Sequence, residues 1–344
     1  MTEQGGTGRP VRVAVDAMGG DYAPAEIVKG AVQAARRLGV AVTLVGVKQD
    51  IEGELGDIDT SGLEVAVVEA DDLIREGEEP AFAVLRKPNS PVAVAARLVK
   101  EGSADAMVSA GSTGACMVAA LQYLGALPGM DRPMAGGPFI GLAPNTVVLD
   151  LGANVGCQPY HLVNFAAAGT VYARTFLGIE QPTVALLNVG VEEGKGNNEA
   201  KEAHQLLKQT GLNFIGNVEG MDIPAGKVNV VVCDGFVGNI LVKFSEGLGK
   251  AITQWLAEKL EGKLAEAEVE DLTASLMKLL SPAMVLGGGP LWGVKGVVAV
   301  AHGASQASQV AGTIEHAKLA LDSDFVGRLQ AEMEKAQKEI ASNV

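Results

Sequence analysis

The sequence contains little of what marks a disulfide scaffold or a metal-binding module. It has only three cysteines, Cys116, Cys157 and Cys233, among 344 residues. Their number is odd and no two of them form a CxxC pair, which argues against a disulfide framework and a structural zinc site. No cluster of His, Cys and Asp has the spacing of metal ligands, so we expect neither a metal nor another cofactor.

Aromatic and basic residues are also scarce. Aromatics make up 4% of a chain that is 48% hydrophobic and contains 44 glycines. This aliphatic, glycine-rich composition is typical of a parallel-sheet enzyme, because parallel strands are covered on both faces and consist mostly of Val, Ile and Leu. The formal net charge of −14 argues against a nucleic-acid partner, which requires a basic face. An anionic substrate would have to be held by local donors.

No uninterrupted apolar run reaches the ~20 residues of a membrane-spanning helix, and the N-terminal MTEQGGTGRP has no signal segment. We therefore expect a cytoplasmic protein in which residues 1–9 form a flexible tail. No linker rich in Ser, Gly or Pro divides residues 10–344, which predicts a single α/β domain.

Strand and helix patterns alternate along the chain, which is typical of βαβ units and a parallel sheet. The predicted strands are Val11–Val15, Val42–Val47, Val65–Val68, Ala106–Ser109, Thr146–Leu151, Thr183–Val189, Phe214–Gly216, Val228–Cys233 and Val297–Ala301. The predicted helices are Ala25–Leu38, Val92–Lys100, Thr113 to about Leu124, His161–Leu177, Glu199–Gln209, Gln306–Leu321 and the tail from Phe325.

Residues 239–281 interrupt this alternation. Apolar residues recur there at helical spacing on both sides of Gly262, which predicts a helical hairpin that packs on the sheet or on a second subunit. The alternative is an interfacial membrane element, which needs basic flanks. Acidic residues such as Glu266, Glu268 and Glu270 oppose that alternative.

Seven predicted strands end in a turn of glycine and small polar residues, and the carboxyl ends of parallel strands converge on a ligand-binding crevice. The turns are DAMGGD, SAGSTGA, DLGAN, NVGVEEGKGN, GNVEG, CDGFVGN and AHGAS. Glycine allows a ligand to approach the main chain, and a helix N-terminus offers unpaired N–H donors, so these turns predict a small anionic ligand. The candidate anion-binding residues are Asp16, Gly19, Gly20, Asp21, Ser109, Gly111, Ser112, Thr113, Gly114, Asn154, Asn188, Gly190, Asn197, Asp234 and His302.

The loop NVGVEEGKGN superficially resembles a P-loop, but its spacing does not fit. Gly190 and Gly194 enclose three residues rather than four, and Gly196 rather than Ser or Thr follows Lys195. Lys195 near glycine amides and a helix N-terminus still suits an anion. No GxGxxG occurs, so an NAD-dependent dehydrogenase is only an alternative.

Side chains in the other turns have both structural and functional interpretations. Ser112 or Thr113 suits a helix cap, and the absence of GxSxG leaves a nucleophilic serine unsupported. Asp234 and Asn239 suit a turn former and a cap, and His302 suits a turn or a general acid.

The motifs VAVDAMGGDYAP, SAGSTGA, VVLDLGANV, LLNVGVEEGKGN, FIGNVEG, VVVCDGFVGN and VAHGAS, in this order between Val11 and Ser323, resemble the PlsX family of phosphate acyltransferases. The resemblance implies a three-layer α/β/α fold with a mostly parallel sheet, similar to phosphotransacetylases and isocitrate-dehydrogenase-like enzymes. It implies transfer of an acyl group from acyl-[acyl carrier protein] to inorganic phosphate, giving acyl phosphate for bacterial phospholipid synthesis. It also implies a homodimer with peripheral membrane contact, here through the 239–281 hairpin.

The same resemblance assigns the catalytic roles to Lys195 and Asn239. We expect these two to stabilise the oxyanion on the thioester, while the DAMGGD and SAGSTGA amides hold phosphate or acyl phosphate. The candidate docking patch for the acidic carrier protein is Arg86, Lys87, Arg97, Lys100, Lys243 and Lys250. The alternatives are an acyl-CoA phosphotransacylase of related fold and a non-catalytic module that binds anions or lipids.

Overall fold

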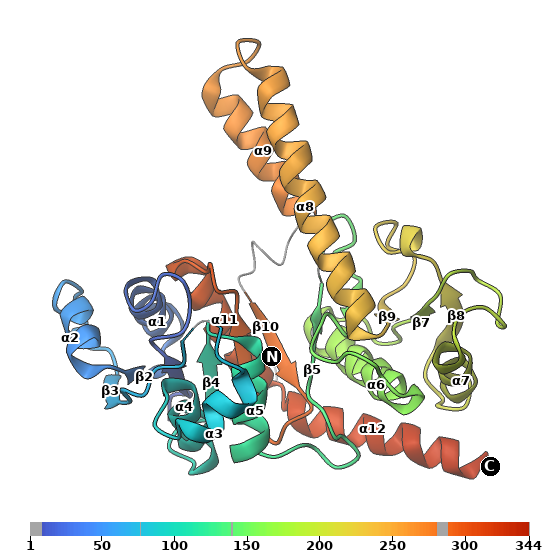
Figure 1. Cartoon of the computed structure of the whole chain (residues 1–344), viewed down its shortest axis with the longest axis horizontal. Helices are drawn as coiled ribbons and strands as arrows, with labels where there is room; N and C mark the ends of the chain where they lie inside the picture. Colours follow the sequence, from blue (N-terminus) through green and yellow to red (C-terminus); the bar gives the residue numbers. More distant parts are fainter. Residues whose placement is uncertain (1–8, 76, 139, 281–287, 344) are drawn as a thin grey trace, which may run out of the picture. The chain divides into compact units, whose positions relative to one another are not determined.

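The computed structural model describes residues 9–75, 77–138, 140–280 and 288–343 (Figure 1). Their contacts divide the chain into two compact units. The first comprises the described parts of Met1–Gly125, Gly287–Pro290 and Val294–Asp322, and the second those of Ala126–Leu286, Leu291–Gly293 and Ser323–Val344. The chain passes between the units more than once, so no single linker marks the division. The single-domain prediction for residues 10–344 stays a prediction.

The first unit contains a five-stranded parallel sheet in the order β3-β2-β1-β4-β11. Its strands are β1 (Arg12–Asp16), β2 (Ala41–Gly46), β3 (Val65–Glu69), β4 (Ala106–Ser109) and β11 (Val297–Ala301). Asp16 at the end of β1 lies opposite Ser109 at the end of β4. The register therefore brings the DAMGGD and SAGSTGA turns to the same edge of the sheet.

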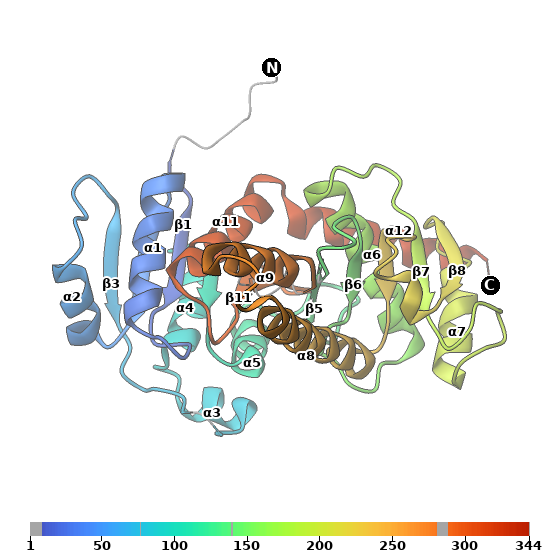
Figure 2. The ribbon, with the colours of Figure 1, turned by 90° about the horizontal axis from the view of Figure 1, so that it is seen from above.

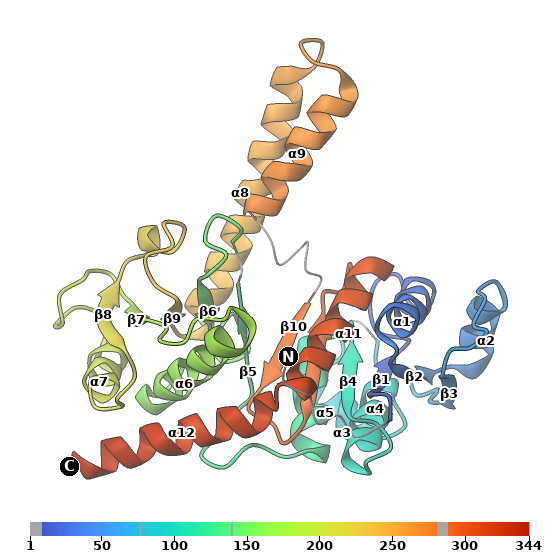
Figure 3. The ribbon, with the colours of Figure 1, turned by 180° about the vertical axis from the view of Figure 1, so that it is seen from behind.

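Helices cover both faces of this sheet, which makes the first unit three-layered (Figures 1 and 3). On one face α1 (Ala25–Leu38) packs against α11 (Ala307–Asp322), and on the other α4 (Pro91–Lys100) packs against α5 (Thr113–Tyr123). Every residue of β4 is buried, as expected for a strand covered on both sides. The predicted α/β fold with a mostly parallel sheet is confirmed.

The second unit has strands in the order β5-β6-β9-β7-β8. They are β5 (Met134–Gly137), β6 (Val147–Leu149), β7 (Val184–Leu187), β8 (Phe214–Val218) and β9 (Val230–Val232). β5 runs antiparallel to β6, and the other pairings are parallel. Leu291 and Trp292 of β10 (Gly288–Trp292) pair antiparallel with β5.

The short strands β6, β7 and β9 of the second unit are apolar on both faces. A Cβ on Gly169 of α6 (Pro159–Phe176) would overlap the side chain of Val230, so this helix lies close against one face of the sheet. α7 (Asn198–Leu207) and α12 (Phe325–Ser342) pack on α6. Val148 and Val231, on the opposite face, join a core cluster that contacts Leu241 of the first helix of the hairpin.

The predicted hairpin is present as α8 (Gly235–Leu260) and α9 (Glu266–Leu280). The two helices lie side by side and extend away from the sheet of their own unit (Figures 1 and 2). α8 begins before the predicted boundary, because Asp234 caps it by accepting a hydrogen bond from the Phe236 amide at 2.8 Å. Phe244 and Trp255 are 66% and 57% exposed. Among the described helices, none is long and apolar enough to cross a membrane.

Several elements were not predicted. Helices α2 (Lys48–Gly56) and α3 (Pro80–Arg86) are short, and the glycine-rich β5 and β10 lack an apolar pattern of their own. The 3-10 turn Gly220–Asp222 also falls outside the predictions. Residues 1–8 of the predicted tail and residue 281 of the hairpin lie outside the described residues. Arg9, the last residue of that tail, pairs with Asp105 at 3.0 Å.

Candidate active site

The DAMGGD turn of the first unit is organised around Asp16. The Asp16 carboxylate accepts hydrogen bonds from the Met18 amide at 3.1 Å and from the Ser109 hydroxyl at 2.7 Å. The Ser109 hydroxyl in turn accepts one from the Gly111 amide at 3.0 Å. Burial raises the pKa of Asp16, although the bonds from Ser109, Met18 and Gly19 oppose that shift. The amides of Met18 and Gly111 are therefore engaged within the protein.

The two turns approach each other so closely that glycine is required. A Cβ on Gly19 would lie 2.6 Å from the Gly111 amide nitrogen. Gly20 has a φ of +111°, and the next amide, that of Asp21, donates to the Gly303 carbonyl at 2.8 Å. The AHGAS turn thus joins the other two at this edge of the sheet.

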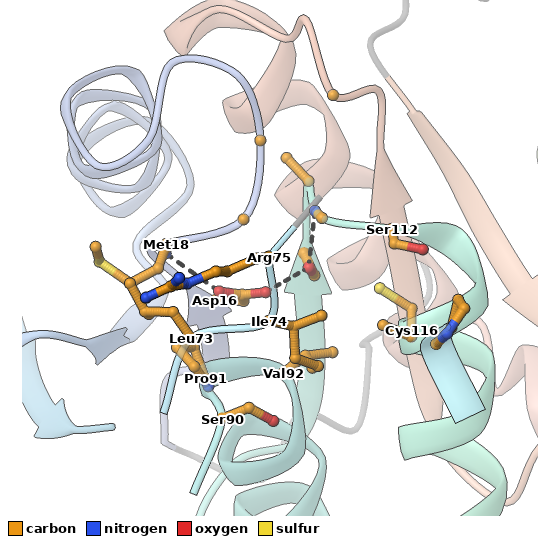
Figure 4. A pocket seen from close by; sticks show the side chains of 18 of the residues that line it. Asp16, Met18, Leu73, Ile74, Arg75, Ser90, Pro91, Val92, Ser112 and Cys116 are labelled. Atoms are coloured by element: carbon orange, nitrogen blue, oxygen red, sulfur yellow. Dashed lines mark hydrogen bonds between the residues drawn. The ribbon is translucent and has the colours of Figure 1, made fainter. Parts of the chain in front are cut away.

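These three turns line a cavity of about 590 Å³, shown in Figure 4. Of the residues predicted to bind an anion, the lining contains Asp16, Gly19, Gly20, Asp21, Ser109, Gly111, Ser112 and Thr113. Of the other two predicted in this unit, Gly114 lies close to Pro80, and His302 is exposed next to the lining residue Gly303. Tertiary structure therefore brings together most of the residues predicted for an anion site in the first unit.

The N-terminus of α5 opens onto this cavity. Ser112 occupies the N-cap position, but its side chain makes no capping hydrogen bond. The first amides of a helix have no partner within the helix, so those at Thr113 and Ala115 suit an anion. One turn further, Cys116 is fully buried, and burial raises the pKa of its thiol to about 12. This cysteine is a poor nucleophile.

Sequence reasoning missed three polar side chains of the lining, Arg75, Glu78 and Ser90. Arg75 lies in the acidic segment DDLIREGEE, outside any glycine turn, and Ser90 precedes Pro91 at the start of α4. Ser90 is fully buried and its hydroxyl has no hydrogen-bond partner. The sequence offers one signal for Arg75, which is that a single basic residue stands in a segment of acidic residues.

In the second unit, the DLGAN turn is built around Asp150. Its carboxylate accepts hydrogen bonds from the amides of Gly152 and Ala153, both at 2.8 Å, and from the Asn154 side chain at 2.5 Å. Burial raises the pKa of Asp150 to about 6. Asn154 also donates to the Pro133 carbonyl at 2.7 Å, so its side-chain amide is used to hold the turn together.

The CDGFVGN turn packs directly onto the DLGAN turn. Asp234 caps α8 and also accepts a hydrogen bond from the Cys157 amide at 2.6 Å. A Cβ on Gly152 would lie 3.1 Å from the Cβ of Asn239, and one on Gly238 would overlap the Asp150 carbonyl. This packing fixes the start of α8 and with it the exposed side chain of Asn239.

The loop that carries Lys195 is closed by its own side chains. Asn188 donates to the Lys195 carbonyl at 3.1 Å, and Asn197 caps α7 by accepting from the Ala200 amide at 2.9 Å. Gly190 is buried against the Lys195 side chain. Lys195 is exposed, and no described carboxylate lies within ion-pair distance of its amine. It is therefore available to a ligand.

A second cavity, of about 500 Å³, lies between that loop and the start of α8. Asn197 and Asp234 line it, and most of its wall is apolar. The apolar wall includes Val155, Leu162, Leu186, Leu187, Phe236 and Val237. The loop of Lys195 contributes Asn197 to this wall and the start of α8 contributes Phe236 and Val237, but neither Lys195 nor Asn239 is itself a lining residue. Among the described residues, no group of three or more His, Cys, Asp or Glu side chains is arranged to hold a metal ion.

Two lysines of the predicted docking patch already form ion pairs. Lys87 pairs with Glu78 at 2.6 Å and donates to the Leu73 carbonyl at 2.7 Å. Lys243 pairs with Glu246 at 2.9 Å. These two lysines have local structural roles.

Comparisons with known proteins identify the family of this chain. The family model described as fatty acid synthesis protein matches residues 11–328. The phosphate acyltransferases of Thermosynechococcus vestitus and Nostoc punctiforme are 46% and 45% identical to this chain, over 93% and 94% of it and 94% and 96% of their own lengths.

Solved structures share the fold at low sequence identity. The EutD phosphotransacetylase from Staphylococcus aureus and a phosphotransacetylase from Streptococcus pyogenes both match with a TM-score of 0.59 and 17% identity. The matches cover 90% and 95% of this chain and 94% and 95% of those chains. The chain therefore belongs to the PlsX family of phosphate acyltransferases, the fatty acid synthesis proteins, and has the α/β fold of the phosphotransacetylases.

Proposed function

We propose that this phosphate acyltransferase transfers the acyl group of acyl-[acyl carrier protein] to inorganic phosphate and releases acyl phosphate and the free carrier. The observation that carries the proposal is the second-unit cavity. Asn197, from the loop that carries Lys195, and Phe236, from the tightly packed start of α8, line a largely apolar space there. Such a space suits an acyl chain whose thioester end meets polar donors.

The reaction needs no covalent enzyme intermediate. A phosphate oxygen attacks the thioester carbonyl carbon, the carbonyl oxygen becomes an oxyanion, and the carbon–sulfur bond then breaks to release the carrier thiolate, which takes up a proton. We assign oxyanion stabilisation to the Lys195 amine and the Asn239 amide. Loss of one such donor costs about 3 to 4 kcal/mol of barrier. The raised pKa values of Cys116 and Cys157 agree with a mechanism without a cysteine nucleophile.

Phosphate binding is assigned to the first-unit cavity, with one change from the sequence prediction. The backbone N–H of Met18 donates to Asp16 and that of Gly111 donates to Ser109. Neither N–H is therefore free to bind a ligand. The uncapped first turn of α5, at Thr113 and Ala115, takes their place. Helix N-termini favour phosphate through free N–H groups and the helix dipole.

Carrier protein, a second copy of the chain and a membrane surface remain proposed partners. The exposed apolar side chains of the hairpin, including Phe244 and Trp255, support its burial in a homodimer. We expect acyl carrier protein, which is acidic, to bind through basic residues that lack a local partner, so its binding should weaken with salt.

The function is tested by incubating the protein with acyl-[acyl carrier protein] or acyl-CoA, with and without phosphate, and measuring released thiol. Lys195→Ala should lower kcat about 100- to 1,000-fold, and the matched control is Lys201→Ala on the exposed first turns of α7. Release that does not depend on phosphate would overturn the proposed reaction. Release from acyl-CoA alone would favour the phosphotransacylase alternative, and a folded Lys195→Ala with wild-type turnover would refute the assignment of Lys195.

A further inference from the structure

We propose that Arg75 is the phosphate-binding cation of the first-unit cavity and that Lys87 holds it in position. This inference rests on the proposed function, since it concerns the phosphate that the reaction consumes. Arg75 is the only Lys, Arg or His among the described residues that line this cavity. Figure 4 shows its extended side chain in the cavity wall together with Asp16 and Ser90.

The segment that carries Arg75 is clamped by Lys87. The Lys87 amine donates to the Leu73 carbonyl at 2.7 Å and to the Glu78 carboxylate at 2.6 Å. The same Glu78 oxygen accepts the backbone N–H of Arg75 at 2.7 Å. One lysine therefore ties together both ends of the segment and fixes the backbone from which the arginine extends.

This clamp also leaves the Arg75 charge free. Glu78 is the nearest carboxylate by sequence among the described lining residues, and it forms its ion pair with Lys87; the bond from Lys87 lowers the pKa of Glu78 most, and the Arg75 backbone N–H and charge lower it further. No described carboxylate forms an ion pair with the Arg75 guanidinium within 4.0 Å. An unpaired guanidinium in a cavity is a binding site for an anion with several oxygens, because its planar fork donates two parallel hydrogen bonds.

Two other carboxylates line the cavity and oppose an anion. Asp16 is 5% exposed and already accepts hydrogen bonds from Ser109 and Met18. Asp21 is exposed to solvent, where its charge is screened. Besides Arg75, the lining offers a phosphate the uncapped start of α5 and the unpaired Ser90 hydroxyl. These groups supply donors and one positive charge.

Steady-state kinetics of Arg75→Gln and Arg75→Lys test the proposal. Losing a charged hydrogen bond of this kind is expected to raise the KM for phosphate roughly 10- to 100-fold in Arg75→Gln, with the KM for the acyl donor unchanged. Arg75→Lys should recover only part of this loss, because an ammonium lacks the fork. Lys87→Met should raise the phosphate KM less than Arg75→Gln, and Lys87→Arg should largely restore it.

The control is Arg37→Ala, which removes a surface arginine paired with Glu315. Phosphate should also raise the melting temperature of the wild type but not that of Arg75→Gln, which keeps the test valid if turnover is too low to measure.

If the wild type is active and Arg75→Gln keeps a normal phosphate KM, the inference is wrong while the proposed function stands. If the acyl-donor KM rises instead, the cavity binds the donor. If the wild type shows no phosphate-dependent release, the proposed function itself fails.

Discussion

Replacing Gly238 by alanine tests whether the packing at the start of α8 controls both stability and activity. Gly238 lies one residue before Asn239, and a Cβ there would overlap the Asp150 carbonyl and lie 2.9 Å from its carbonyl carbon. These are backbone atoms of a turn held by three hydrogen bonds to the Asp150 carboxylate. They cannot swing aside as a flexible side chain would, so the helix start must move.

The expected cost is that of overpacking, about 1 to 3 kcal/mol of unfolding free energy. Gly247 provides a matched control in the same helix, because a Cβ there has no neighbour within 4 Å. Gly247→Ala should stabilise the protein by about 0.5 to 1 kcal/mol, since alanine loses less conformational freedom than glycine on folding. The two substitutions should therefore have opposite signs.

Urea denaturation of both variants measures the stability difference, and phosphate-dependent thiol release measures activity. A shift of about 1 Å in the position of a catalytic group costs on the order of 100-fold in rate, so Gly238→Ala should lose activity even where it remains folded. Gly247→Ala should keep wild-type kinetics. Equal stability and activity in the two variants would refute the view that this contact positions Asn239.

Two further predictions follow from buried titratable groups. The folded-state pKa of Asp150 is raised from 3.8 to about 6, so its contribution to stability is present below pH 4 and is lost as pH rises through 6, by about 3 kcal/mol. The test compares the unfolding free energies of Asp150→Asn and of the wild type at pH 4 and at pH 7. The value for Asp150→Asn minus the value for the wild type should be larger at pH 7 by this amount. The same difference at both pH values would contradict the prediction. Cys116 and Cys157 have pKa values of about 12, so the native protein should react with iodoacetamide at pH 8 far more slowly than the urea-unfolded chain. Rapid labelling of the native protein would count against that burial.

Some strongly patterned elements were predicted to the residue. Ala25–Leu38, Ala106–Ser109 and Val297–Ala301 were predicted with the observed boundaries, because their apolar pattern and flanking breakers are local. The strand predicted as Thr183–Val189 ends at Leu187 instead, and Val189 is 79% exposed. Its β-branched side chain favours a strand, but the pairing of β7 with β8 ends at Leu187 and Val218, and no described strand continues beyond that point to pair with Val189.

The glycine turns of the candidate site were identified from the sequence because glycine next to a small polar residue after a strand is a local signal. Their internal hydrogen bonds were not. The sequence alone does not show that Asp16 takes up the Met18 amide or that Asn154 holds the DLGAN turn. Those contacts depend on which strands lie side by side.

The sequence by itself determined the α/β class, the hairpin and the two turns that carry Lys195 and Asn239, since these depend on residue pattern within a short stretch. Only the tertiary structure decided which amides remain free, that Lys87 clamps the segment of Arg75, and that this arginine lines the same cavity as the start of α5. Arg75 and Thr113 are far apart in the sequence. They line the same cavity because α3, α4 and α5 pack around one edge of the sheet. No local sequence pattern encodes that packing.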